Sequence, residues 1–206
     1  MRQFFLMAAL VAAPAAAQGV SLAEVQAALV ATTSMTADFV QTAGNGSQAR
    51  GVMSLQRPGR IRFDYGPGAR ILVVADGRNL SFIDYKVGQV SQWPVKATPL
   101  GVLLDPRADL SRVARVLPDS EVPVPGMVGV VASDPKRPDL GRITFFLSRS
   151  AGAPGGLALA GWRVVDAQGQ QTQVQLSNIV WNPAIPAGRF AFVDPRRRLM
   201  PPGKGG

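Results

Sequence analysis

Short segments in which apolar and polar residues alternate follow one another from residue 35 to residue 193, and this pattern constrains the fold most. Successive side chains of a β-strand point to opposite faces, so a period of two predicts strands with one apolar face. Segment 56–65 is the clearest example, because Pro58-Gly59 can reverse the chain before a strand begins. The apolar face of that strand carries Ile61, Phe63 and Tyr65.

The same signal recurs along the chain between turn residues. The expected strands are 35–39, 51–55, 61–65, 71–75, 80–85, 87–90, 127–132, 142–147, 157–165, 172–181 and 189–193. An antiparallel sheet of this size twists and coils and does not stay flat. We therefore expect a mainly β protein with a curved antiparallel sheet of about eleven strands, which either closes on itself or wraps partway round and needs a cover on its concave face.

Two segments break the strand pattern and predict helices. Ser21 and Glu24 have the spacing of a capping box, which starts a helix. Segment 98–106 is very apolar, with Pro99 at a first helical position and Pro106 at the end. Segment 110–116 fits either another helical turn or a strand. We expect the helices to form a lid that covers an apolar cavity on the concave face of the sheet.

The N-terminus has the three parts of a secretory signal peptide. Arg2 is followed by an apolar run from Phe4 to Ala13 and by small residues, which predicts cleavage after Ala17. The apolar run is too short to span a bilayer. We expect a signal peptide at 1–17, one domain at 18–195 and a flexible, basic, Pro/Gly-rich tail at 196–206. The mature protein is expected to be exported and soluble. The cleavage site fits a bacterial periplasm or a eukaryotic secretory route, and the lack of Cys favours the periplasm.

The composition excludes several functional classes. The chain has no Cys and no His, so thiol nucleophiles, Ser-His-Asp catalysis and His-based metal sites are ruled out. Its carboxylates lie scattered at turns and strand ends, and we expect no enzyme activity, no metal site and no cofactor. The 22 Lys and Arg against 13 Asp and Glu give a formal charge of +9. That charge favours an anionic partner, although nucleic acid is the least expected one for an exported protein.

Several stretches together resemble one family, the periplasmic carriers of outer-membrane lipoproteins (LolA-like proteins). The matching stretches are Thr36-Ala37-Asp38-Phe39-Val40-Gln41, Arg57-Pro58-Gly59-Arg60-Ile61-Arg62-Phe63, Val73-Val74-Ala75-Asp76-Gly77-Arg78-Asn79-Leu80, the helix from Thr98 to Leu104, and Arg189-Phe190-Ala191-Phe192. Their order covers most of the mature chain, with 108–156 matching least. The sequence departs at Ile61 and Phe63, where family members often carry Phe and Trp.

The resemblance implies an incomplete antiparallel β-barrel that is closed by helices. It also implies a chaperone that takes acylated lipoproteins from an inner-membrane ATP-driven exporter and delivers them to an outer-membrane acceptor. It also implies that Arg57, the arginine of the Arg-Pro motif, ties the lid closed and supports transfer. Chemistry alone favours an ordinary solvated arginine at a turn, since exposed charge pairs contribute little, and the resemblance reverses that preference. We expect a monomer. A lipid-binding or lipoprotein-binding module of an envelope-stress sensor is the alternative function.

The acyl chains are expected to contact apolar side chains of the sheet and the lid, although plain core packing would explain the same residues. One strand alone does not fix which face points inward. The predicted cavity residues are Ile61, Phe63, Tyr65, Leu72, Val74, Phe82, Trp93, Leu100, Leu103 and Leu104.

Overall fold

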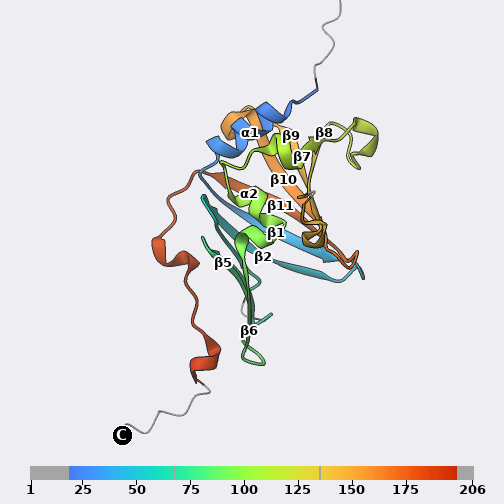
Figure 1. Ribbon diagram of the computed structural model, residues 1–206. Helices are drawn as coiled ribbons and strands as arrows, with labels where there is room; N and C mark the ends of the chain where they lie inside the picture. Colours follow the sequence, from blue (N-terminus) through green and yellow to red (C-terminus); the bar gives the residue numbers. More distant parts are fainter. Residues whose placement is uncertain (1–18, 67, 135, 199–206) are drawn as a thin grey trace, which may run out of the picture.

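A computed structural model describes residues 19–66, 68–134 and 136–198, and it consists of one curved antiparallel sheet with short helices on its concave side (Figure 1). The predicted signal peptide at 1–17 lies outside the described residues, as does most of the predicted tail. The strands are β1 (Ser34–Ala43), β2 (Gln48–Gln56), β3 (Arg60–Asp64), β4 (Ile71–Asp76), β5 (Asn79–Asp84), β6 (Gln89–Pro94), β7 (Ala114–Val116), β8 (Met127–Ala132), β9 (Arg142–Arg149), β10 (Leu157–Val165) and β11 (Gln171–Trp181).

The strand order is β6-β5-β4-β3-β2-β1-β11-β10-β9-β8-β7, with antiparallel pairing throughout. Strands that pair are consecutive in sequence except where β1 meets β11, which joins the two halves, and β6 and β7 lie at the two ends of the sheet. Register shifts between Thr36 and Asp38 in β1 and between Leu159 and Gly161 in β10 are bulges, and bulges bend a sheet. The predicted incomplete barrel is confirmed.

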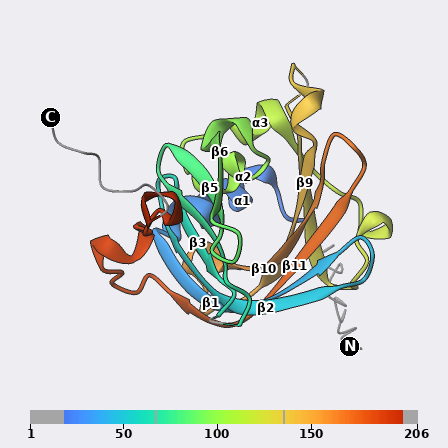
Figure 2. The ribbon, with the colours of Figure 1, turned by 90° about the horizontal axis from the view of Figure 1, so that it is seen from below.

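Three α-helices lie against this sheet: α1 (Leu22–Ala31), α2 (Leu100–Leu104) and α3 (Leu110–Val113). Figure 2 shows the sheet curving around α1 and α2. The predicted capping box starts α1, since Glu24 N donates to Ser21 Oγ at 3.2 Å and Ser21 N donates to Glu24 Oε2 at 2.8 Å. Segment 110–116, which fitted a helix or a strand, forms one turn of helix followed by β7. Within the described residues, no helix is both long and apolar enough to cross a membrane.

The main core lies between the concave face of the sheet and the helices. It combines apolar residues of β1–β4 and β8–β11 with Val25, Leu29, Leu103, Leu104 and Leu110 of the helices. Because Leu103, Leu104 and Leu110 are completely or almost completely buried, the helices are structural parts of this core.

A second cluster of buried residues lies on the opposite, convex face of the sheet. We call it the outer cluster; its buried members are Leu72, Val74, Ile83 and Phe190. Phe190 belongs to the segment 183–193, which we call the C-terminal strap, and Ile185 and Phe192 of the strap pack against the same cluster. The strap was predicted to contain a strand at 189–193. That prediction is wrong: the segment forms the 3₁₀ turn η5 (Ala187–Phe190) and an extended stretch that crosses the sheet face.

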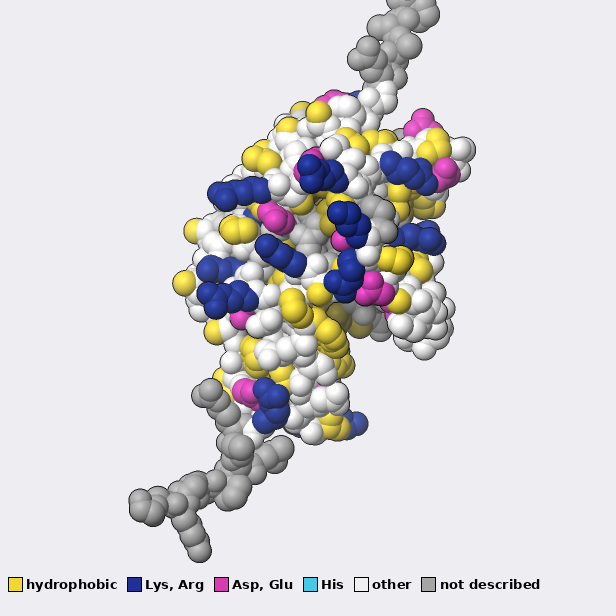
Figure 3. Space-filling view, in the orientation of Figure 1, with side chains coloured by type: hydrophobic (Ala, Val, Ile, Leu, Met, Phe, Trp, Pro, Cys, Tyr) yellow, Lys and Arg dark blue, Asp and Glu magenta, His cyan; other side chains and the backbone are white. Residues whose placement is uncertain are grey.

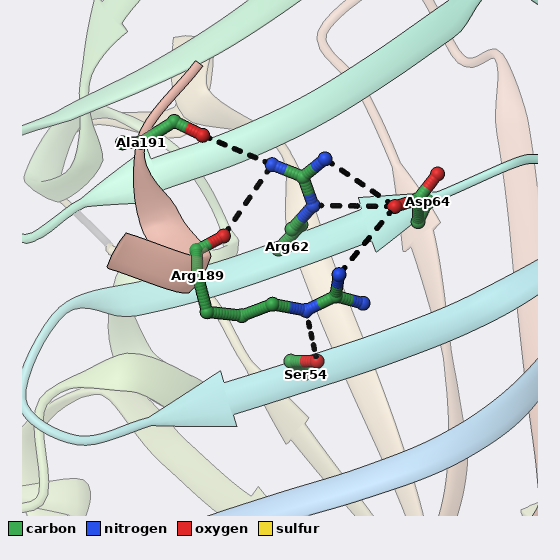
Figure 4. A network of polar contacts seen from close by, with 5 residues as sticks. All are labelled: Ser54, Arg62, Asp64, Arg189 and Ala191. Carbon is green, nitrogen blue, oxygen red and sulfur yellow. Dashed lines mark hydrogen bonds and ion pairs between the residues drawn. The ribbon is translucent and has the colours of Figure 1, made fainter. Parts of the chain in front are cut away.

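Polar contacts fasten the strap to β2 and β3 (Figure 4). Arg62 donates to the carbonyl oxygens of Arg189 and Ala191, at 3.4 and 3.1 Å. The guanidinium of Arg189 donates to Ser54 Oγ at 3.2 Å and lies 3.7 Å from the Asp64 carboxylate, which also pairs with Arg62 at 3.3 Å. One carboxylate thus stands between two arginines, one from the sheet and one from the strap.

Candidate functional site

The turn after β2 contacts the C-terminal ends of two lid helices. Arg57 Nε donates to the carbonyl oxygen of Leu103 at 2.9 Å, and its Nη1 donates to that of Thr32. The backbone adds two bonds, from Arg57 N to Thr33 O at 2.8 Å and from Gly59 N to Leu104 O at 2.9 Å. The last carbonyls of a helix have no partner within the helix, so an arginine suits them as a donor. We call Arg57 and its two carbonyl partners the latch.

Burial of the charged Arg57 side chain costs solvation free energy. Burial lowers the pKa of Arg57 from its ordinary value to about 10, because the charged form loses solvation. The guanidinium is therefore still protonated at neutral pH. The guanidinium of Arg57 donates to two backbone carbonyl oxygens. These uncharged acceptors satisfy its N–H groups but do not neutralise its positive charge. The buried cation is thus held by two carbonyl dipoles.

The end of α1 is held independently of the latch by Asn182. Its Oδ1 accepts from Thr33 N at 2.8 Å, Thr33 Oγ1 at 3.1 Å and Ser34 N at 3.3 Å, and its Nδ2 donates to Ala31 O at 3.1 Å. Sequence reasoning missed this residue, although Asn followed by Pro just after a strand is a turn signal. Asn182 fixes the chain segment that presents the Thr32 carbonyl to Arg57.

Six of the predicted cavity residues lie together in or against the main core. Ile61 and Phe63 of β3 and Leu103 and Leu104 of α2 are buried, and the partly buried Tyr65 and Leu100 pack against them. The aromatic rings meet edge to face, with centroids 5.3 Å apart for Phe39 and Phe63 and 5.1 Å apart for Phe39 and Tyr65. Sheet and lid thus share one apolar interior.

Two predicted cavity residues lie on the wrong face for that interior. Leu72 and Val74 belong to the outer cluster and pack under the C-terminal strap, so their prediction as part of the concave wall is wrong. The residues of β4 that contact the main core are Val73 and Ala75. Strand β4 is apolar on both faces, and the strap covers its convex face. Its residues do not alternate between apolar and polar, so the sequence does not show which face points inward.

The two remaining predicted residues lie toward the free edge of the sheet at β6. Phe82 pairs with Val73, and Trp93 pairs with Leu80, and directly opposed residues share a face. Both therefore belong to the concave side, but Phe82 is only half-buried and Trp93 is 48% exposed. They extend the apolar surface outward from the closed interior.

The interior is closed around the latch. A space of only about 10 Å³ remains beside Arg57, between α1, the lid side of β9 and β10, and Trp181. A space that barely admits one water molecule is far too small for an acyl chain. Any acyl chain that enters the main core must displace lid side chains.

Comparison with known proteins identifies the family. Residues 31–193 match the model of the family described as outer membrane lipoprotein carrier protein LolA. The chain belongs to the LolA family. The outer-membrane lipoprotein carrier protein of Chromobacterium violaceum is 30% identical over 92% of this chain and 90% of its own length. The carrier of Legionella pneumophila strain Paris is 31% identical over 95% of this chain and 96% of its own. The family resemblance inferred from the sequence motifs is confirmed.

This chain is also similar to a solved structure, that of a LolA superfamily protein from Nitrosomonas europaea. The two are 12% identical, with a TM-score of 0.42, and the match covers 81% of this chain and 94% of that one.

Alkaline titration tests the burial of the aromatic wall. Tyr65 donates to Gln41 Oε1 at 2.7 Å, and burial raises its pKa to about 12. The unfolded chain loses this proton near pH 10, so stability should fall as the pH rises from about 10 toward 12. Absorbance near 295 nm should show one of the two tyrosines titrating near pH 12, and Tyr65→Phe should remove that step. A single transition near pH 10 in the wild-type protein would contradict the burial.

Proposed function

We propose that this protein is a periplasmic chaperone that carries acylated lipoproteins from the inner to the outer membrane and shields their acyl chains beneath the helical lid. The observation that carries the proposal is the latch. One protonated arginine ties the ends of α1 and α2 to the sheet above an apolar interior. Family membership supports the same function.

The energetics explain why a carrier needs such a lid. Burial of an acyl chain yields about 0.8 kcal/mol per CH₂, so an open pocket for several chains would bind almost irreversibly. Here the interior is already filled by Leu103 and Leu104. Cargo must compete with these side chains and with the latch, which lowers the net affinity. Weak net binding allows an acceptor to remove the cargo.

The partners follow from the same proposal. An ATP-driven exporter of the inner membrane supplies the cargo, because displacement of the lid and extraction of acyl chains from a bilayer both cost free energy. An acceptor at the outer membrane binds the acyl chains more tightly than this protein does. Residues 1–17 serve as the export signal, residues 18–195 as the carrier domain of a monomer, and residues 196–206 as a basic tail.

A sensor module for envelope stress is not favoured as an alternative. The relatives named as lipoprotein carriers align over more than nine tenths of this chain.

Depletion of the protein in cells tests the proposal. We expect outer-membrane lipoproteins to accumulate in the inner membrane, as measured by fractionation of the two membranes and immunoblotting. Cells that express the wild-type protein from a second copy serve as the control. Normal sorting of lipoproteins in depleted cells without a paralogue would overturn the function.

A further inference from the structure

The described sheet has two free edges, and the lid segment connects them. The strand order ends at β6 on one side and at β7 on the other. Residues 95–113, which contain η1 (Val95–Ala97), α2 and α3, run from the first edge to the second. We call this junction the seam. Helix side chains close the seam, where a complete barrel would have paired strands.

A pocket of about 380 Å³ opens at the seam. One wall is the outer side of α2, with Pro99 and Val102, and the opposite wall is formed by the end of β8 and by η3 (Pro138–Leu140), with Ala132 and Leu140. In Figure 3 the surface is hollowed beside α2, and basic and acidic side chains surround the hollow. We call this the seam pocket.

The seam pocket adjoins the main core directly. Ala132, one of its lining residues, is a buried member of that core, and Val102 packs against it. Val102 precedes Leu103, whose carbonyl accepts from Arg57. The pockets on the convex face, which Arg70 and Tyr85 line, lie on the other side of the sheet beside the C-terminal strap and the outer cluster. An apolar chain in the seam pocket would thus touch the lid helix that the latch holds.

The rim of the seam pocket is polar and already organised. Asp105 accepts from Arg107 N at 3.0 Å, Asp109 pairs with Arg112 at 3.1 Å, and Asp134 accepts from Lys136 N at 2.9 Å. Lys96 also lines the pocket. Charged residues of both signs thus line the pocket together with apolar residues such as Val102 and Leu140. This arrangement suits a chain that is apolar at one end and joined to a neutral polar backbone at the other.

We propose, resting on the proposed function, that the seam pocket is the entry port for the cargo: it receives the first acyl chain of a lipoprotein while the latch is still closed. The acyl chain occupies the pocket against Val102, and the peptide and its ester groups stay at the charged rim. Displacement of α2 then breaks the Arg57–Leu103 contact and lets the chain into the main core. Entry precedes opening, and release follows the same route in reverse.

Substitutions that fill the seam pocket with a larger side chain test whether cargo enters through it. Val102→Trp fills it from the lid, and Leu140→Trp fills it from η3, outside the lid. Val87→Trp, at the exposed turn between β5 and β6, is the matched control. Stopped-flow fluorescence would follow binding and release of a synthetic peptide with a tripalmitoylated N-terminal cysteine and a dansyl group. Circular dichroism confirms that each variant is folded.

Because a blocked route slows both directions, both seam variants should lower the association and dissociation rates together, by roughly tenfold, with little change in Kd. Val87→Trp should match the wild type. Unchanged rates in both seam variants, or a rise in the dissociation rate alone, would overturn the port. A wild-type protein that does not bind the peptide at all would instead refute the carrier function.

Parallel measurements with free palmitate and with a lysophospholipid distinguish the source of the acyl chain. The port predicts that the substitutions slow the palmitoylated peptide at least as much as either lipid. Slowing of the lipids alone, with normal rates for the peptide, would overturn the assignment to lipoproteins.

Discussion

Replacement of Arg57 by leucine should retain and tighten acyl-chain binding and block handover to the acceptor. The substitution removes two hydrogen bonds from a charged donor to the carbonyls of Leu103 and Thr32. Such bonds contribute about 1.5–3 kcal/mol each. Since closure of the lid competes with cargo, a weaker closed state raises the fraction of binding-competent protein and tightens apparent binding. If the net loss corresponds to one such bond, cargo affinity should rise roughly tenfold to a hundredfold.

The measurement is transfer of a purified radiolabelled lipoprotein from the carrier to its acceptor in vitro. Arg60→Leu is the matched control, because Arg60 begins β3 directly after the same turn and its exposed side chain donates to Gln56 Oε1 at 3.2 Å and not to a lid helix. The control should transfer cargo at the wild-type rate. Transfer at the wild-type rate by Arg57→Leu as well would remove Arg57 from the mechanism.

Truncation of Phe190 should destabilise the fold more than any change at the latch. The side chain is 5% exposed and packs with Leu72, Val74 and Ile83 on the convex face. Replacement of a buried Phe by Ala typically costs about 3–5 kcal/mol, and the loss here also loosens the strap that Arg62 and Asp64 fasten. We expect Phe190→Ala to lower the free energy of unfolding in urea by about 3 kcal/mol or more.

Val193→Ala is the control for the strap, because Val193 is 63% exposed and its truncation should change stability by less than about 0.5 kcal/mol. Acyl-chain binding per folded molecule should be unchanged in Phe190→Ala, since the outer cluster lies on the face away from the lid. Equal stability of the two variants would show that the strap is not part of the folded unit.

The fold could be predicted from the sequence because most of its determinants are local. Ser21 and Glu24 define the start of α1 by their spacing, and the turn at Pro58-Gly59 sets β2 against β3. Which sheet face the C-terminal strap covers was not predictable, because the strap and β4 are far apart in sequence. The alternation of Phe190 and Phe192 is real, but these side chains meet a sheet face and not a strand edge. That same coverage buries Leu72 and Val74 on the convex side, which made both faces of β4 look like core.

The site was predictable only in part for a similar reason. Arg57 was found through the family resemblance, whereas its acceptors, Thr32 and Leu103, lie 25 and 46 residues away in the chain and are backbone atoms. No side-chain pattern encodes such acceptors. Asn182 binds Thr33 from 149 residues away, and only the fold brings β11 beside the end of α1.

Mass spectrometry of the material bound to the protein tests the central claim most directly. The wild-type and Arg57→Leu proteins would be purified from the periplasm under native conditions, and any bound polypeptides would be identified together with their acyl modifications. The account predicts triacylated lipoproteins on both, with more on Arg57→Leu than on the wild type. An Arg57→Leu protein that carries no acylated polypeptide would contradict it.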